Sequence, residues 1–182
     1  MTHVKNDKRS QRTSEVLYVS LAKLLESRNF ADINVSTLVR KAQIGRSSFY
    51  RNFDTIEDVF SYQCEKEAED FYQAVTERKD DIGSFLLTFF SYWTKNISLL
   101  VTLKKADRIV ILFNALKKNP FLVSPLSAAD RDRGYLSMIY LGSLITTLSC
   151  WIDKGEKETP TQLASIVKQS LPLNRESILT QI

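Results

Sequence analysis

Residues that interrupt helices are scarce in this chain, and their scarcity limits the folds open to it. Its 182 residues include only five Gly and four Pro. Apolar side chains recur with helical spacing nearly throughout, and no segment shows a convincing strand pattern. Apolar residues make up 43% of the chain, which is enough for a sizeable core. We therefore expect an all-α protein of about nine helices.

Capping residues mark several of the predicted helix ends. Asn34 is a good N-cap, and Thr55 and Thr159 each begin a sequence that resembles a capping box. Asn29 is expected to end the first helix in the left-handed conformation, which Asn tolerates. The predicted helices span approximately residues 10–28, 35–42, 46–52, 55–78, 82–95, 97–105, 107–118, 128–153 and 159–170.

Basic residues gather in the first third of the chain. Residues 1–53 hold ten Lys and Arg against four Asp and Glu, a net charge of +6. Residues 54–182 hold fifteen against seventeen, a net charge of −2. A basic segment on a near-neutral body is typical of a protein that binds a polyanion, although a solvated basic tail has the same signature.

Two short helices joined by a tight turn at residues 34–53 form a helix-turn-helix pattern. Phe49 and Phe53 lie four residues apart on the second helix and are expected to face the interior. The opposite face carries Arg46, Ser47, Tyr50 and Arg51. Cations, a small hydroxyl and a phenol are suited to DNA phosphates and base edges. The pattern alone is equally compatible with an ordinary helical hairpin that has a hydrated face.

Four runs of sequence extend this pattern with a recognisable spacing. They are Leu24–Phe30, Asn34–Ala42, Ile44–Phe53 and Glu57–Val59. Their core is a small residue, the turn, and then a bulky residue followed by Tyr and, three positions later, Phe. In these runs, residues 12–60 resemble the DNA-binding domain of the TetR/AcrR family of transcriptional regulators. The remainder of the chain shares only the helical layout of that family.

The resemblance implies two domains and a function. Residues 9–69 would form a TetR-type helix-turn-helix domain of three helices, and residues 70–182 a helical regulatory and dimerisation domain. The protein would be a ligand-responsive repressor that binds a palindromic operator in double-stranded DNA as a homodimer. Its operator, its regulated genes, its effector and the choice between repression and activation are not determined by the sequence.

The resemblance also assigns roles to six residues. Three lie at the end of the second helix that would enter the major groove, and base contacts are expected from Arg46, Ser47 and Ser48. Phosphate contacts are expected from Thr37, Tyr50 and Arg51. Thr37 would be aided by free backbone N–H groups at the start of its helix.

The chain departs from the family pattern at the edges of this motif. Gln43 replaces the usual turn Gly, which predicts slight strain, and Gly45 replaces the usual Ser cap of the recognition helix. Ile56 stands where many members have a Lys, so one phosphate contact is lost. These departures leave open a TetR-like coregulator that acts through protein partners with weak or no DNA binding. The basic residues Arg40 and Lys41 argue against that alternative.

An uncharged run of nineteen residues spans Gly134–Ile152. Its length is borderline for a membrane span, but its Ser and Thr residues favour a buried helix, and no membrane partner is expected. The run has two apolar stripes, so one is expected to face a second copy of the chain, together with the final helix. The expected dimer contacts are Tyr140, Leu144, Trp151, Leu163, Ile166 and Val167.

Aromatic residues are frequent in the middle helices. In the family such helices often line an effector pocket, which here would include Phe89, Trp93 and Phe113 and accept a small apolar or aromatic ligand. Ordinary core packing is the competing interpretation of the same residues.

Catalytic signatures are absent from the sequence. His3 is the single His, and there is no Gly-rich phosphate loop, nucleophile motif or cluster of metal-ligand residues. We expect no enzyme activity and no cofactor. Cys64 and Cys150 lie in apolar helical patterns and are expected to be buried, in a reducing cytoplasm. The polar, basic N-terminus shows no secretory signal.

Overall fold

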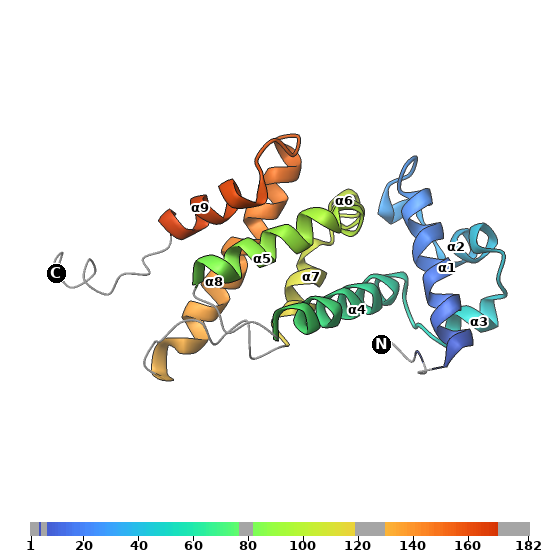
Figure 1. The fold of residues 1–182 in the computed structure, drawn as a ribbon. Helices are drawn as coiled ribbons and strands as arrows, with labels where there is room; N and C mark the ends of the chain where they lie inside the picture. The colour runs from blue at the N-terminus through green and yellow to red at the C-terminus, as the bar shows by residue number, and fades with distance from the viewer. Residues whose placement is uncertain (1–3, 5–6, 77–81, 119–129, 171–182) are drawn as a thin grey trace. The chain divides into compact units, whose positions relative to one another are not determined.

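The computed structural model describes Val4 and residues 7–76, 82–118 and 130–170 (Figure 1). Within these residues all regular structure is helical, with nine α-helices, one short 3-10 helix and no strand. The predicted all-α class is confirmed. The chain divides into two compact units, which are Met1–Asp70 with Val101–Ala115, and Phe71–Leu100 with Leu116–Ile182.

The first unit begins with a compact group of short helices. Asp7 caps the first of them, because its carboxylate accepts hydrogen bonds from the backbone N–H of Arg9 and Ser10 at 3.0 and 2.9 Å. Leu17, Leu21 and other apolar side chains of this helix face inward. The helices are α1 (Lys8–Leu24), the 3-10 turn η1 (Phe30–Asp32), α2 (Val35–Ala42) and α3 (Arg46–Tyr50).

The predicted end of the first helix is wrong. α1 stops at Leu24, and Leu25 follows it in the right-handed helical region. Asn29 has φ −69° and ψ 149°, so it is extended and precedes η1 instead of closing α1 in the left-handed region. A turn from Leu24 to Ser27, with a backbone hydrogen bond of 3.3 Å, ends the helix earlier than its apolar pattern indicated.

Three further helices contribute to the first unit, and α4 begins at the predicted capping box. The backbone N–H of Thr55 donates to the Asp58 carboxylate at 2.8 Å, and the Asp58 N–H donates back to the Thr55 hydroxyl at 3.3 Å. The helices are α4 (Ile56–Thr76), α6 (Ile97–Lys105) and α7 (Ile109–Leu116).

The segment 101–115 belongs to the first unit, although the sequence predicts it in the second domain. Its attachment is specific. Arg108 Nε lies 2.5 Å from the Glu57 carboxylate, and the guanidinium lies 5.0 Å from the Phe30 ring centroid. The Tyr18 hydroxyl forms a hydrogen bond with Thr102, and burial raises the pKa of Tyr18. No local sequence pattern predicts contacts between residues so far apart in the chain.

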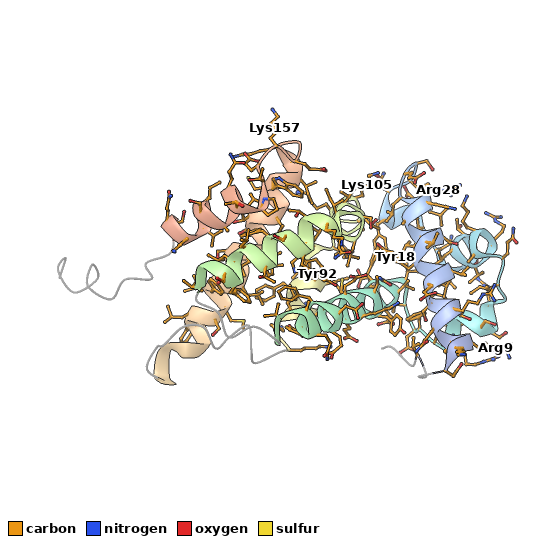
Figure 2. All side chains as sticks on the ribbon, in the orientation of Figure 1. Arg9, Tyr18, Arg28, Tyr92, Lys105 and Lys157 are labelled. Atoms are coloured by element: carbon orange, nitrogen blue, oxygen red, sulfur yellow. The ribbon has the colours of Figure 1, made fainter. Side chains whose placement is uncertain are left out.

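The second unit contains an aromatic core. Its helices are α5 (Ile82–Lys95), α8 (Asp130–Asp153) and α9 (Pro160–Ser170), together with the end of α4. α5 packs against both α8 and α9. The Phe71 ring centroid lies 5.6 Å from that of Phe89 and 6.0 Å from that of Trp93. Tyr92, labelled in Figure 2, is part of the same cluster.

α8 has one buried and one exposed side. By length and composition, residues Gly134–Asp153 could cross a membrane. Tyr140 and Leu144 are nevertheless buried inside the second unit. Cys150 is exposed, so its predicted burial is wrong, because it lies on the outer side of this helix. Cys64 is buried as predicted. The predicted loop at residues 119–127 lies outside the described residues.

Candidate nucleic-acid interface

The turn between α2 and α3 is fixed by backbone geometry and one side-chain cap. Asn34 caps α2 as predicted, since its side-chain oxygen accepts from the Thr37 N–H at 2.9 Å. Gln43 has φ 55°, so it adopts the left-handed conformation that the usual Gly of this turn would adopt without strain. Its neighbour Ile44 donates to the Val39 carbonyl at 3.0 Å. The chain therefore reverses within three residues before α3 begins.

α3 is anchored by its inner face. Phe49 and Phe53 are both fully buried, with ring centroids 6.0 Å apart. The buried Asn52 side chain donates to the Ser48 carbonyl at 2.8 Å and closes the end of the helix. Gly45 precedes α3 without a side-chain cap, as its sequence implied. The five-residue helix α3 is therefore held in place by Phe49 within it and by Phe53 just beyond its end.

The outer face of α3 brings together the side chains that the sequence singled out. Tyr50 is 54% exposed, and its ring meets Phe49 edge-on at 5.3 Å between centroids. Arg46, Ser47 and Arg51 are exposed, whereas Ser48 is half-buried. Thr37 lies half-buried on α2. This arrangement offers cations and hydroxyl groups to an incoming ligand without disturbing the core.

Two hydrogen bonds refine these expectations. Arg46 Nη2 donates to the hydroxyl of Ser36, which joins α3 to the first turn of α2. Ser36 was not predicted as part of the site, and its only local signal is its place beside Thr37 in the first turn of a helix. The Thr37 N–H donates to Asn34 Oδ1, so this N–H group of the first turn is not free. For Thr37 to contact a phosphate, its hydroxyl would have to leave Asn34 Oδ1, to which it donates at 3.2 Å, and donate to a phosphate oxygen instead.

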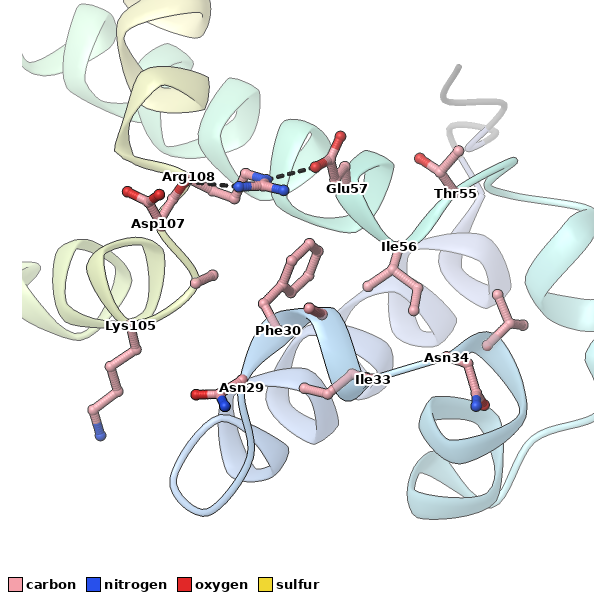
Figure 3. A pocket seen from close by; sticks show the side chains of 13 residues that line it. Asn29, Phe30, Ile33, Asn34, Thr55, Ile56, Glu57, Lys105, Asp107 and Arg108 are labelled. Carbon is pink, nitrogen blue, oxygen red and sulfur yellow. Dashed lines mark hydrogen bonds and ion pairs between the residues drawn. The ribbon is translucent and has the colours of Figure 1, made fainter.

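Ile56, which stands where many TetR-like proteins have a Lys, lines a pocket of the first unit. The pocket has a volume of about 800 Å³, and Figure 3 shows Ile56, Ile33 and Phe30 around it. Arg108 closes one side, held by Glu57. The lining of the same pocket also includes the charged residues Glu57, Lys105, Asp107 and Arg108.

The predicted effector residues divide between the two units. Phe89 and Trp93 are fully buried in the aromatic core of the second unit, with centroids 6.3 Å apart. Phe113 belongs to the first unit. The geometry favours core packing for Phe89 and Trp93. Two donors in this core have no hydrogen-bond partner among the described residues, namely Trp93 Nε1 and the Tyr140 hydroxyl.

Most of the predicted dimer contacts are interior residues of a single chain. Five of the six are buried within the single chain and offer little surface to a second copy, namely Tyr140, Leu144, Trp151, Leu163 and Val167. Ile166 is 48% exposed. The sequence showed two apolar stripes but not which one α5 and α9 would cover. The exposed apolar residues of α8 are instead Tyr135, Leu136, Met138 and Ile139.

Three solved structures share the arrangement of these helices. Lin0861 from Listeria innocua aligns with a TM-score of 0.80 over 99% of both chains, at 18% identity. A TetR transcriptional regulator from Streptococcus agalactiae 2603V aligns with a TM-score of 0.64 over 87% of this chain and 93% of its own, at 22% identity. A TetR transcriptional regulator from Rhodococcus sp. RHA1 aligns with a TM-score of 0.53 over 96% and 99%, at 8% identity.

No family model and no curated protein matches the sequence. The structural likeness therefore concerns the backbone arrangement, and it extends over nearly the whole length of each of these chains. The two neighbours with descriptive names are both TetR regulators. The chain has the all-helical TetR-like fold that its N-terminal sequence implied.

Proposed function

We propose that this protein is a DNA-binding transcriptional regulator that inserts α3 into the major groove. The observation that carries the proposal is the division of α3 into a buried aromatic face and an exposed face with Arg46, Ser47 and Tyr50. In a helix-turn-helix protein the second helix lies in the major groove while the first crosses the backbone. Here α2 and α3 are those helices.

The exposed residues of α3 would divide into two kinds of contact. Arg46 is the candidate for base edges, because a guanidinium can donate two hydrogen bonds to a guanine. Its hydrogen bond to Ser36 uses one nitrogen and leaves other N–H groups free to reach DNA. Ser47 and Ser48 would complete the base contacts. Tyr50, Arg51 and the Thr37 hydroxyl would contact phosphate oxygens.

A homodimer on a palindromic operator completes the proposal. Tyr135 and Ile139 on α8 are 77% and 61% exposed, and Ile166 on α9 is 48% exposed. Large apolar residues left outside a chain are often covered by a partner. Two-fold pairing would place two α3 helices in successive major grooves, about 34–36 Å apart. We assign the dimer surface to these residues in place of the buried ones.

Ligand-responsive repression is the most specific part of the proposal. Its support is the buried Tyr140 hydroxyl, which has no hydrogen-bond partner among the described residues and whose ring lies beside Phe85. A small apolar or aromatic effector with a hydrogen-bond acceptor would satisfy such a donor, at a site where an unmade hydrogen bond is costly. Its binding would favour one spacing of the two DNA-binding units over another.

The alternative is a TetR-like coregulator that acts through protein partners. Gly45 and Ile56 favour it, because each removes an anchor or a charge that would help hold DNA. The exposed Arg46 and Arg51 oppose it. An enzyme remains the less supported class, since no motif in the sequence points to a reaction.

A binding titration distinguishes these functions. The full chain is titrated with a labelled duplex from the region upstream of its own gene and with a random-sequence duplex, over a series of salt concentrations. We expect tighter binding to the upstream duplex and an affinity for both that falls as salt rises. Absence of salt-dependent binding to either duplex would contradict the proposal and support the coregulator.

A further inference from the structure

A second polar surface of the first unit lies between α1 and α2. It carries basic residues that are not part of the contacts proposed for α3. It is a groove of about 640 Å³. α1 and the turn after it contribute Lys23, Ser27 and Arg28, and α2 contributes Arg40 and Lys41. Figure 2 shows Arg28 at the opposite end of α1 from Arg9. Among the residues that the structure describes, no acidic one lines the groove.

The four cations of the α1–α2 groove are available to a ligand. Lys23, Arg28, Arg40 and Lys41 are all exposed. None of them forms an ion pair with another residue in the part of the chain that the structure describes. Like charges around one groove repel one another, and a bound anion relieves that repulsion. The groove therefore fits a polyanion better than an apolar or cationic partner.

Its position identifies the polyanion. Thr37, the candidate phosphate contact of α2, also lines the α1–α2 groove. α2 is the helix that crosses the DNA backbone in a helix-turn-helix protein, so its exposed basic residues face phosphates when α3 is in the major groove. Hydroxyls and cations together are the side chains that bind phosphate and sugar.

We propose that the α1–α2 groove is a second DNA-contact surface, which holds the sugar-phosphate backbone beside the base pairs that α3 reads. The proposal rests on the DNA-binding function proposed above and extends it to Lys23 and Arg28, which lie outside the helix-turn-helix. It also offers phosphate contacts in place of the one that Ile56 lacks. These contacts add affinity without sequence preference.

The test uses the full chain and a short random-sequence duplex, because phosphate contacts do not depend on sequence. One variant carries Lys23→Gln with Arg28→Gln. A matched control carries Lys154→Gln with Lys157→Gln, which removes the same charge from exposed residues of the second unit. Arg51→Ala reports on α3. Circular dichroism confirms that each variant keeps its helices, and salt titrations above about 0.1 M limit long-range effects.

We expect the groove variant to lower the slope of log affinity against log salt by about 0.9 for each lost contact, while the control keeps the original slope. A groove variant that matches the control, while Arg51→Ala lowers the slope, would overturn the groove assignment and leave the DNA-binding function intact. Absence of DNA binding by the unaltered protein would overturn both. The same variants are also titrated with poly-glutamate. If the groove variant lost binding to poly-glutamate and kept its DNA binding, the groove would be assigned to an acidic protein partner instead.

Discussion

At the scale of single residues, Arg46 is both open to solvent and hydrogen-bonded to a neighbouring helix. It is exposed on α3, and it donates to the Ser36 hydroxyl on α2. The bond restricts a long, flexible side chain before any ligand arrives, which reduces the conformational entropy lost when the side chain is immobilised. Arg51, one turn further along, has no such tether among the described contacts. The two arginines should therefore respond differently to substitution.

Arg46→Ala is expected to cost about 1–3 kcal/mol per half-site on the operator and to relax base preference. Arg51→Ala should weaken operator and random DNA evenly and reduce the salt slope by about one. Fluorescence anisotropy on both duplexes measures these effects. An equal loss on all sequences for Arg46→Ala would make it a phosphate contact and leave base reading to Ser47 and Ser48.

The cap of α2 gives a prediction about stability. Asn34→Ala removes the acceptor for the Thr37 N–H and should lower the free energy of unfolding by about 0.5–2 kcal/mol. Asn34→Ser keeps an acceptor and serves as the control, with a smaller loss. Urea denaturation followed by circular dichroism compares the two. Equal stability of the unaltered protein and the Ala variant would show that tertiary packing alone holds the start of α2.

At the scale of elements, two buried tyrosines of the second unit differ in whether their hydroxyl groups have a hydrogen-bond partner. The Tyr140 hydroxyl has no partner among the described residues, and burial raises its pKa, so it stays protonated. The Tyr72 hydroxyl, in contrast, donates to the Leu116 carbonyl. The unsatisfied Tyr140 hydroxyl therefore destabilises the folded protein when no ligand is bound. The Tyr72 hydroxyl stabilises it by joining segments 44 residues apart.

Tyr140→Phe should leave the melting temperature of the ligand-free protein unchanged or higher, because it deletes an unsatisfied buried hydroxyl. Tyr72→Phe is the matched control and should lower the free energy of unfolding by about 0.5–1.5 kcal/mol, since a made hydrogen bond is lost. Thermal denaturation of both variants provides the comparison. Clear destabilisation by Tyr140→Phe would mean that the hydroxyl has an acceptor.

Local signals predicted the elements better than they predicted their surroundings. Asn34 and Thr55 cap helices as expected because a cap involves residues only three positions apart. The prediction for Asn29 is wrong because a turn after Leu24 ends the helix while apolar residues continue at helical spacing. The burial of Tyr140 and the exposure of Cys150 depend on how α5 and α9 cover α8, which no periodicity in α8 itself could specify.

The candidate site divides in the same way. The outward set on α3 was predictable because Phe49 and Phe53 fix one face of a short helix. Ser36 and the α1–α2 groove were not, because they depend on contacts between helices. Lys23 and Arg28 appeared in the sequence only as part of a general positive charge.

At the scale of the whole molecule, the proposed dimer places the exposed apolar residues of α8 at a two-fold axis. Light scattering should give a mass near twice 20.9 kDa. Ile139→Asp should shift the protein towards monomer while preserving its helical content, since Ile139 is 61% exposed within the chain. Val110→Asp, at a residue 56% exposed in the first unit, is the control and should leave the mass unchanged. A monomeric unaltered protein at micromolar concentration would refute the dimer.

The return of residues 101–115 to the first unit has a consequence for how this protein can be cut and recombined. Residues 9–69 are contiguous, yet the unit they belong to also needs a strip of chain that is encoded some thirty residues beyond its apparent end. A gene fragment that stops at codon 70 would separate Phe30 and Glu57 from Arg108, and Tyr18 from Thr102. A chimaera with another regulator would have to inherit both pieces together, so the unit proposed to bind DNA cannot be exchanged as one continuous segment.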